Sequence, residues 1–496
     1  MYLKIKPTIL LAVLLVVSAM AASVDAQSPE GDHPPAHTLN DPTRPVYHLV
    51  SQVKGSHIAD PNFAIYWKGR YHLFYITARN SETKTRNFAH VSSTDMVHWR
   101  HHPETNFGGL SGTMFLSKEG VPTIIARPGP KIAMLTPMDE QLEQWEVSTT
   151  VEPTFAPGQD GSQLGEKHWD PDAWVVGDTT YVLMGVHPLS PGRKLGLLKT
   201  TDMKTFHFVD YFLDVDMPGV SRTTDVKTND DVSCPNFFPL GNKWMLLCIS
   251  HNKGCRYYLG DWKDEKFTPD FHGWMNWHKG DVDSTHGHGG DVFAPESLLT
   301  PDGRRVMWAW LFAQSKLRVS DNWQEVLSLP RELSLPEDGV LRIKPLRELE
   351  QLREDPKTES EIRVQADTPY RLKEISGDTI ELMLTIKQGE AKRYGVKLLC
   401  DEDNGKGLDV VVEPSSKILQ VGKSKAPLEL SDGEDINLRI FIDRSVVEVF
   451  ANERQAVVWQ HPYQPGEVGV CLFTEGGLME VPEVKSWHMK PAANSK

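Results

Sequence analysis

The chain has 496 residues, of which 39% are hydrophobic and 24% charged, so it is long enough for two or more folded domains. Its formal net charge of -14 excludes nucleic acid and anionic membrane surfaces as main partners, because both would repel it. A neutral substrate fits this charge better.

The first residues have the pattern of an export signal. Lys4 and Lys6 precede an apolar stretch at residues 9–17, and small residues lead to Ala26. We predict a signal peptide over residues 1–26 and a secreted or periplasmic protein. An uncleaved anchor is the alternative, but the apolar stretch is too short to span a bilayer, and no later segment approaches that length.

Cysteines are few and odd in number for an exported chain, so core packing has to supply the stability. Cys248 and Cys255 could pair across a hairpin, and two buried free thiols are the alternative. The remaining cysteines are Cys234, Cys400 and Cys471.

After an expected linker at residues 27–45, short apolar or aromatic runs alternate with turn residues. Residues 63–67 and 71–75 flank a Lys-Gly-Arg turn, and residues 173–184 and 236–247 repeat this arrangement. Each unit predicts a hairpin with a glycine-bearing turn.

A second sequence pattern recurs among these hairpins. Residues 93–99 and 200–206 each place an aspartate, Asp95 or Asp202, in a turn between a strand end and an aromatic residue. Such a recurring unit is typical of a radial array of small sheets, so we predict a β-propeller over residues 46–335.

The pattern changes beyond residue 335. Residues 347–354 are rich in charge and predict a short helix at a domain junction, which we place at residues 336–358. Segments such as 436–441 and 446–450 then alternate apolar and polar residues, as strands with one buried face do. We predict a β-sandwich over residues 359–490; the alternative is that these strands complete the first domain.

Three spaced fragments place short polar residues at the ends of apolar runs, where the chain can present them into a cleft. They are residues 57–62 (His-Ile-Ala-Asp-Pro-Asn), 168–172 (His-Trp-Asp-Pro-Asp) and 233–239 (Ser-Cys-Pro-Asn-Phe-Phe-Pro). The first two fragments offer Asp60 and Asp170.

Together with other segments in the same order, these fragments resemble motifs of the glycoside hydrolases that include invertases, levanases and inulinases (family 32). The matching segments are residues 57–62 to Trp-Met-Asn-Asp-Pro-Asn, 69–75 to Gly-x-Tyr-His-Leu-Phe-Tyr, 110–113 to Phe-Ser-Gly-Ser, 169–171 to Arg-Asp-Pro, 233–235 to Glu-Cys-Pro, 293–296 to Tyr-Ala-Pro-Gln, 329–333 to the propeller-closing strand, and 442–450 to Val-Asp-Arg-Ser-Ser-Val-Glu-Val-Phe. The resemblance implies an all-β protein with a five-bladed β-propeller followed by a C-terminal β-sandwich. It also implies hydrolysis of β-fructosides or a related furanoside with retention, on a carbohydrate substrate and without a cofactor.

Retaining hydrolysis needs a carboxylate that attacks the anomeric carbon and a protonated carboxyl that donates its proton to the leaving oxygen. The two carboxyl groups lie about 5 Å apart. By its match to the family motif, Asp60 would be the nucleophile. Asp170 would stabilise charge and bind sugar hydroxyls as the oxocarbenium ion develops. For each, the structural alternative is a turn aspartate that caps the backbone before proline.

The proton donor departs from the family pattern, because Ser233 stands where the motif has glutamate. A hydroxyl is too weak an acid for this duty near neutral pH. Asp231 would point to the same face as Ser233, and Glu296 replaces a neutral Gln of relatives. Burial beside other carboxylates would raise the pKa of Glu296 toward the range that a general acid needs. We therefore favour Glu296 as the proton donor, and the alternative is that it is an ordinary surface glutamate.

The sugar contacts depart from the family as well. Ala59, Trp169 and Ile76 replace the Asn, Arg and Gln that family members use to hold fructose, which puts the identity of the sugar in question. Trp169 could instead stack on a sugar face. The candidate substrate-binding residues are Asn62, Trp67, Ser111, Trp169, Ser233 and Asp231.

One cluster lies outside the resemblance, between Asp281 and Asp291, and contains further Asp and His residues among glycines. These residue types can bind divalent metal, but their spacing matches no metal motif. We expect a solvated loop and no metal site.

Three hypotheses follow for the function. The chain is a β-fructosidase-like hydrolase with a relocated acid, a hydrolase of another furanoside or glycan on the same fold, or a carbohydrate-binding pseudoenzyme that kept the cleft and lost turnover.

Overall fold

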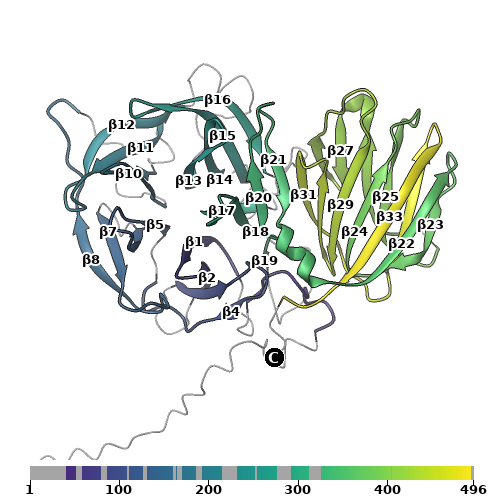
Figure 1. Ribbon diagram of the computed structural model, residues 1–496, viewed down its shortest axis with the longest axis horizontal. Helices are drawn as coiled ribbons and strands as arrows, with labels where there is room; N and C mark the ends of the chain where they lie inside the picture. The colour runs from purple at the N-terminus through teal and green to yellow at the C-terminus, as the bar shows by residue number, and fades with distance from the viewer. Residues whose placement is uncertain are drawn as a thin grey trace, which may run out of the picture.

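The computed structural model describes residues 41–51, 58–79, 86–108, 111–126, 131–159, 164, 170–185, 193–214, 232–251, 254–275, 292–311, 325–403 and 405–492. In this part of the chain, five sheets of four or five strands surround a common axis, and two six-stranded sheets form a second body beside them (Figure 1). The prediction of an all-β protein with a five-bladed propeller followed by a β-sandwich is confirmed.

The propeller blades follow one another in chain order, and each is a meander of antiparallel strands. The strands are β1 (Pro61–Trp67), β2 (Arg70–Arg79), β3 (Arg86–Ser93) and β4 (Arg100–His101); β5 (Gly112–Leu116), β6 (Pro122–Ala126), β7 (Ile132–Pro137) and β8 (Trp145–Val151); β9 (Asp172–Val176), β10 (Thr179–Met184), β11 (Arg193–Thr200) and β12 (His207–Asp214); β13 (Ser233–Leu240), β14 (Lys243–Ser250), β15 (Gly254–Lys263) and β16 (Lys266–Trp274); and β17 (Val292–Leu299), β18 (Arg305–Leu311), β19 (Val326–Leu327), β20 (Arg331–Ser334) and β21 (Arg342–Pro345).

The first strand of every blade lines the axis. β1 contacts β5 and β17, β5 contacts β9, and β13 contacts β9 and β17, which closes a ring of five inner strands. Figure 1 shows β1, β5, β13 and β17 around the centre, with β4, β8, β12 and β16 at the rim. Because every blade is built outward from its first strand in the same way, the inner strands all begin at one mouth of the ring.

The three hairpins predicted from the sequence are β1–β2, β9–β10 and β13–β14. In the first, Trp67 pairs with Arg70 across the two-residue turn Lys68-Gly69, and both turn residues have positive φ, 44° and 86°. Such a turn matches the right-handed twist of the strands it joins.

The recurring aspartate turns are present too. Oδ1 of Asp95 accepts the backbone N–H groups of Val97 and His98, at 3.0 and 2.8 Å. Asp202 does the same for Lys204 and Thr205, both at 2.8 Å. Each turn follows the third strand of its blade and sends the chain toward the rim.

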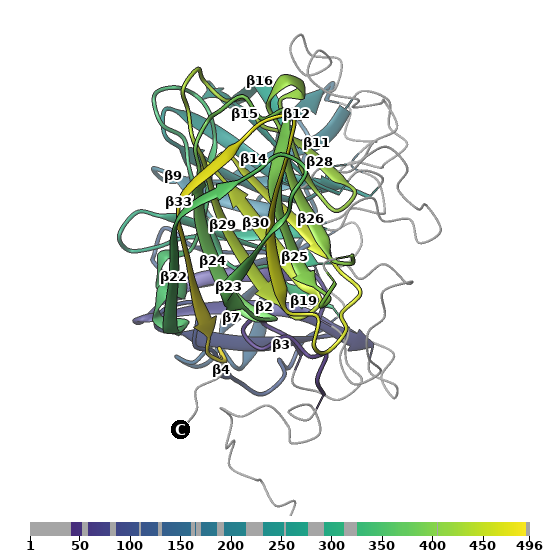
Figure 2. The same ribbon diagram turned by 90° about the vertical axis from the view of Figure 1, so that its right-hand side faces the viewer.

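The sandwich consists of two sheets in the orders β22-β33-β24-β29-β30-β31 and β23-β32-β25-β26-β27-β28. Figure 2 shows them side by side in front of the propeller. Their strands are β22 (Arg353–Val364), β23 (Tyr370–Ser376), β24 (Thr379–Ile386), β25 (Arg393–Cys400), β26 (Leu408–Glu413), β27 (Ile418–Val421), β28 (Ser424–Pro427), β29 (Ile436–Asp443), β30 (Val446–Ala451), β31 (Gln455–Gln460), β32 (Gly469–Glu475) and β33 (Met479–Met489). The alternating segments of the sequence form β29, β30 and β31, so these strands do not complete the propeller.

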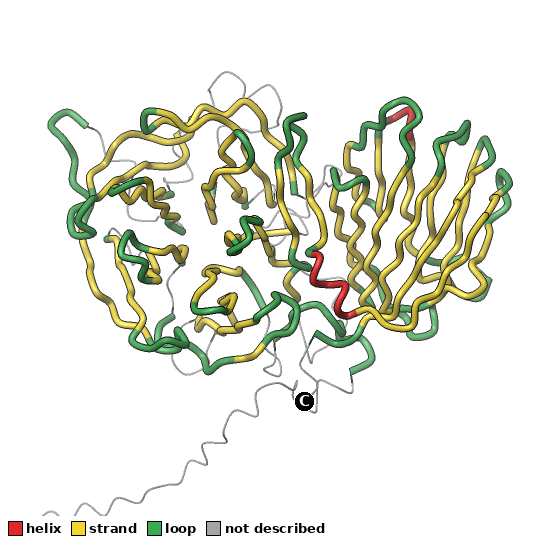
Figure 3. Tube along the Cα trace, viewed as in Figure 1, coloured by secondary structure: helices red, strands yellow, loops and turns green. Residues whose placement is uncertain are grey.

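Two short 3-10 helices, η3 (Arg347–Leu352) and η4 (Pro414–Ser416), stand out in Figure 3. η3 lies between the last propeller strand and the first sandwich strand, where the charged stretch predicted a short helix. It buries Leu349 and Leu352, leaves Glu350 exposed and keeps Glu348 half-buried. The exact limits of the domains and of the junction stay predictions.

Buried charges join the N-terminal segment, the propeller and the sandwich. His48 contacts Asp443 through Nδ1 at 2.8 Å and Glu448 through Nε2 at 3.2 Å, and Arg331 donates to Glu448 at 2.9 Å. Around these groups, apolar side chains of both bodies, Phe450 of the sandwich among them, form one continuous core. The two bodies are therefore packed through matched apolar and charged surfaces.

All five cysteines are described and none forms a disulfide, so Cys248 and Cys255 are the two buried thiols of the alternative prediction. Within the described ranges, no helix is long and apolar enough to cross a membrane. The predicted signal peptide lies outside the described residues.

Candidate active site

Four of the five inner strands enter the ring through the same three-residue pattern. Asp60, Asp170, Cys234 and Ala294 are each followed by a proline and then by a polar residue. Proline has no N–H and cannot donate to a strand ladder, so it is tolerated at a strand start or a bulge. The pattern therefore interrupts each strand at the mouth of the ring.

The interruptions appear as irregular register and strained backbone. β1, β13 and β17 each shift register across their proline, and Asp170, Cys234 and Ala294 have positive φ of 38°, 47° and 41°. Such conformations are costly for residues other than glycine and cluster at functional sites, where a bulge re-aims a side chain. Here they coincide with the start of the inner strands at the mouth of the ring.

The two predicted catalytic aspartates both stand at this mouth, just before inner strands β1 and β9, which are two blades apart. Asp60 is half-buried, and its carbonyl accepts the N–H of Ile76 at 3.0 Å and the amide of Asn62 at 3.4 Å. Asp170 is also half-buried, and its Oδ2 accepts both the N–H and the Sγ–H of Cys234 at 3.2 Å. The backbone of Asp60 and the carboxylate of Asp170 are thus each held by a residue of a neighbouring strand.

One step deeper, a second set of polar residues meets on the axis. Glu296 of β17 is 3% exposed and accepts hydrogen bonds from Thr113 of β5 at 3.4 Å, Asn236 of β13 at 3.5 Å and the backbone N–H of Ala64 in β1. Asp172 of β9 is 5% exposed and lies close enough to raise the pKa of Glu296. We call Thr113, Asp172, Asn236 and Glu296 the axial network. It draws one group from each of four blades.

Burial sets the charge of the axial network. Loss of hydration raises the pKa of Asp172 to about 7, although the N–H of Phe237, 2.7 Å away, opposes the shift. Burial, and then the neighbouring Asp172, raise the pKa of Glu296 well above its ordinary value. Arg305 lies near both acids, and its own burial lowers its pKa to about 10. Both shifts disfavour the charged form of the acid, which for Glu296 is the direction that the sequence predicted.

Three further residues predicted to bind substrate lie at or near the starts of inner strands. Ser233 begins β13 with a side chain that is 0% exposed, and the next residue, Cys234, makes the contact to Asp170. Asn62 is buried directly below Asp60, and its Oδ1 has no hydrogen-bond partner among the described residues. Ser111 is half-buried just before β5, at the same mouth.

Trp67 is not brought to this mouth. It ends β1 at the hairpin turn, about 20 Å along the strand from Asp60 at the usual rise per residue. The structure therefore separates Trp67 from the aspartate with which it was predicted to bind substrate, because β1 runs the full depth of the ring.

Two predicted residues, Trp169 and Asp231, and the Asp/His segment at 281–291 lie outside the described residues. Within the described part of the chain, no group of three or more His, Cys, Asp or Glu residues is arranged to hold a metal ion.

Asp172, Asn236 and Thr113 are polar residues at the axis that the sequence analysis did not single out. A signal for the first two was present, because the residue after each inner-strand proline is Asn62, Asp172, Asn236 or Glu296. Reading the four segments as one repeat would have placed these side chains on a common level of the ring.

Carboxylates at the mouth of a five-bladed propeller that packs on a β-sandwich define a glycoside hydrolase. The family within this class follows from comparison with known proteins.

This chain belongs to glycosyl hydrolases family 32. The model of the family's N-terminal domain matches residues 48–345, and that of its C-terminal domain matches residues 348–488. Members of the family are glycosidases, so the class of reaction is the hydrolysis of glycosidic bonds.

Among similar curated proteins, raffinose invertase of Escherichia coli is 27% identical over 88% of this chain and 94% of its own length. Levanbiose-producing levanase of Bacillus subtilis is 24% identical over 90% of this chain and 90% of its own length. Among solved structures, fructan 1-exohydrolase IIa of Cichorium intybus has a TM-score of 0.74 at 16% identity, covering 91% of this chain and 98% of its own. Exo-inulinase of Aspergillus awamori has a TM-score of 0.72 at 17% identity, and the match covers 91% of this chain and 99% of the inulinase.

Proposed function

We propose that this protein is an exported, retaining β-fructosidase. The observation that carries the proposal is the position of Asp60 and Asp170, which lie at the same mouth of a family 32 propeller just before the inner strands β1 and β9. The similar proteins support the substrate class, since their names include an invertase, levanases, an inulinase and a fructan exohydrolase.

In this proposal, a carboxylate oxygen of Asp60 attacks the anomeric carbon of the fructosyl unit while the bond to the leaving oxygen breaks. Asp170, held by Cys234, stabilises the positive charge that develops on the ring and accepts hydrogen bonds from sugar hydroxyls. Water then cleaves the fructosyl ester at the anomeric carbon, which frees Asp60 and gives the product the starting configuration.

The leaving oxygen needs a proton, and Glu296 is the proposed source. Its burial raises its pKa well above the ordinary value, which favours the protonated form that a general acid requires, and the resulting carboxylate would then take a proton from the attacking water. Thr113 and Asn236 would hold the carboxyl in place during both steps. This assignment is independent of the roles of Asp60 and Asp170.

Neutral fructosides are the expected substrates. The net charge of -14 repels phosphorylated sugars, and the one described cation near the axial acids, Arg305, is buried beside Asp172 and Glu296. The predicted signal peptide supports export, which would give the enzyme access to extracellular sugars.

The test is hydrolysis of a panel of sucrose, raffinose, inulin, levan and arabinofuranosides by the purified protein. Release of fructose from at least one β-fructoside is expected. Activity on arabinofuranosides alone would overturn the fructosidase assignment and leave the family assignment intact.

A second function is favoured by one observation, the buried Ser233 at the position of the family's acid. A chain without a proton donor would bind carbohydrate and not turn it over. Under this alternative, the whole panel stays intact while sugar binding is measurable, and Ser233→Glu restores hydrolysis.

A further inference from the structure

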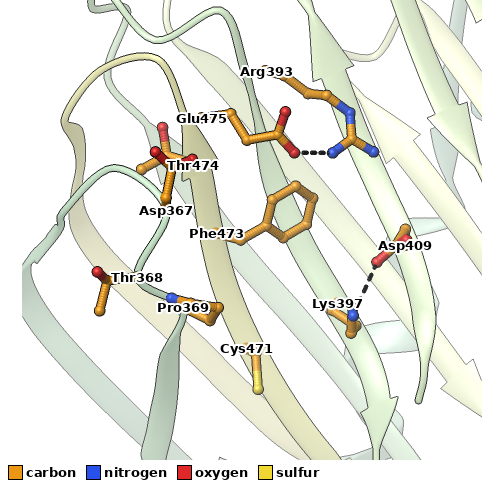
Figure 4. A pocket seen from close by; sticks show the side chains of 10 residues that line it. All are labelled: Asp367, Thr368, Pro369, Arg393, Lys397, Asp409, Cys471, Phe473, Thr474 and Glu475. Atoms are coloured by element: carbon orange, nitrogen blue, oxygen red, sulfur yellow. Dashed lines mark hydrogen bonds and ion pairs between the residues drawn. The ribbon is translucent and has the colours of Figure 1, made fainter. Parts of the chain in front are cut away.

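The sandwich carries a cavity of about 350 Å³ that the proposed reaction does not use (Figure 4). It lies on the outer face of the sheet that contains β32, β25 and β26. Along β32, Val470 and Leu472 point into the sandwich core, so Cys471, Phe473 and Glu475 point outward and line the cavity. Its volume is at the lower end of the range of about 300–1,000 Å³ for small-ligand sites.

Phe473 provides an aromatic surface at the centre of the cavity. It is half-buried and pairs across the strands with Gly395, which has no side chain to cover the ring. A Cβ at Gly395 would lie 1.9 Å from the carbonyl oxygen of Val410, so the close approach of β26 requires glycine here. The bare strand beside the ring keeps the cavity open.

Ion pairs flank the aromatic ring on two sides. Figure 4 shows Arg393 paired with Glu475 beside Phe473, and Lys397 paired with Asp409 at 3.8 Å. The guanidinium of Arg393 also lies 5.5 Å from the centre of the Phe473 ring. Donors and acceptors therefore surround one apolar surface at close range.

The charges of the cavity favour a neutral ligand. Arg393 and Lys397 are each matched by a carboxylate, and the loop that forms the wall adds Asp367. Without an excess of positive charge, an anion gains little here. A neutral polyhydroxylated molecule can stack an apolar face on the ring and exchange hydrogen bonds with both members of each ion pair.

We propose that this cavity is a second, non-catalytic binding site for one sugar residue of a fructan chain. The inference rests on the proposed function, because it takes its ligand from the same substrate class. The ring of Phe473 would stack on the apolar face of the sugar. Glu475 and Asp409 would accept from its hydroxyls, and Arg393 and Lys397 would donate to them. A site on the sandwich would hold a polymer near the propeller and raise the effective substrate concentration at the mouth.

Binding is measured on Asp60→Asn, so that no substrate is consumed, by calorimetric titration with oligosaccharides from levan and inulin. The Asp60→Asn chain is expected to show two binding components, and adding Phe473→Ala is expected to weaken one of them by about tenfold and to leave the other, which belongs to the mouth, unchanged. The matched control is Phe271→Ala, which removes a 45% exposed phenylalanine of the propeller and should change nothing.

Equal binding by the Phe473→Ala and Phe271→Ala versions would overturn the proposal, as would a second component displaced by inorganic phosphate and not by sugar. If Phe473→Ala does not fold, Lys397→Met keeps the aliphatic stem, removes the donor and should weaken the same component several-fold. A fructosidase that lacks the second component refutes only this site. Binding without hydrolysis of any β-fructoside refutes only the proposed function.

Discussion

Ser233 and Glu296 are the two residues on which the chemistry of this site depends. Ser233 is completely buried and supplies no acid, whereas Glu296 has a raised pKa and accepts hydrogen bonds from Thr113 and Asn236. Motif resemblance predicted the positions of Asp60 and Glu296. It could not predict the axial network, because Thr113 and Glu296 are 183 residues apart and meet only when the ring closes.

Glu296→Gln separates the acid role from a structural role. Glutamine keeps the volume, and its amide can donate to Thr113. Because the folded pKa of Glu296 lies above its unfolded value, the native state binds more protons, so this group costs stability as pH rises above about 4.5. We expect a melting temperature at pH 7 equal to or above that of the unaltered chain, and a loss of about 10²–10⁴-fold in kcat for substrates with poor leaving groups. Unchanged kcat with retained stability would remove Glu296 from the acid role.

At the scale of elements, turn chemistry was the reliable guide. Glycine-bearing turns and aspartate turns predicted the hairpins β1–β2, β9–β10 and β13–β14 and the exits of two blades. The bulges of β1, β13 and β17 were not predicted, although proline stands in each, because a proline at a strand start is compatible with regular and with bulged pairing.

The first blade contains a histidine stack that makes it sensitive to acid. The Nδ1 of His72 on β2 lies 2.9 Å from Nε2 of His90 on β3, and the His90 ring stacks between Phe74 and His102 at 4.1 and 4.0 Å. Arg70 and Arg100 lie close by, and Glu143 contacts His102 at 2.8 Å. Burial lowers the pKa of His72 to about 3 and that of His90 well below its ordinary value.

The unfolded chain binds protons at these histidines below about pH 6.5, and the folded chain does not until far lower pH. Stability contributed by the stack is therefore present above pH 6.5 and lost as pH falls from 6.5 toward 3, by up to about 1.4 kcal/mol per pH unit for each group. We expect His72→Gln to flatten the fall of melting temperature between pH 6.5 and 4, and His207→Gln, an exposed control, to leave it unchanged. Equal slopes in both variants would contradict this account.

At the scale of the whole molecule, the two bodies share one core and one buried charge cluster. His48, Arg331, Asp443 and Glu448 come from the N-terminal segment, β20, β29 and β30. Hydrogen bonds to Asp443 and Glu448 raise the pKa of His48 to about 9 against its burial. Residues 442–450 match a family motif, but the match did not predict that Asp443 and Glu448 serve the contact between the bodies, since their partners lie more than 100 residues away.

Glu448→Gln is expected to lower the free energy of unfolding by about 3–5 kcal/mol, because it leaves Arg331 buried without a counter-charge. Urea unfolding measures the change. Glu429→Gln, which removes an exposed partner of Lys417, is the control and should leave the midpoint in place. A shift for Glu448→Gln no larger than that of the control would show that the cluster does not stabilise the assembly of the two bodies.

The most direct test of the central claim is the anomeric configuration of fructose released from a β-fructoside, followed by NMR in the first minutes of reaction with the unaltered chain and with Asp60→Asn. Retention through Asp60 predicts that the unaltered chain releases β-fructose before mutarotation, and that Asp60→Asn stays folded but loses at least about 10³-fold in kcat. Initial release of the inverted anomer, or hydrolysis by Asp60→Asn at the rate of the unaltered chain, would contradict the assignment of Asp60 as nucleophile.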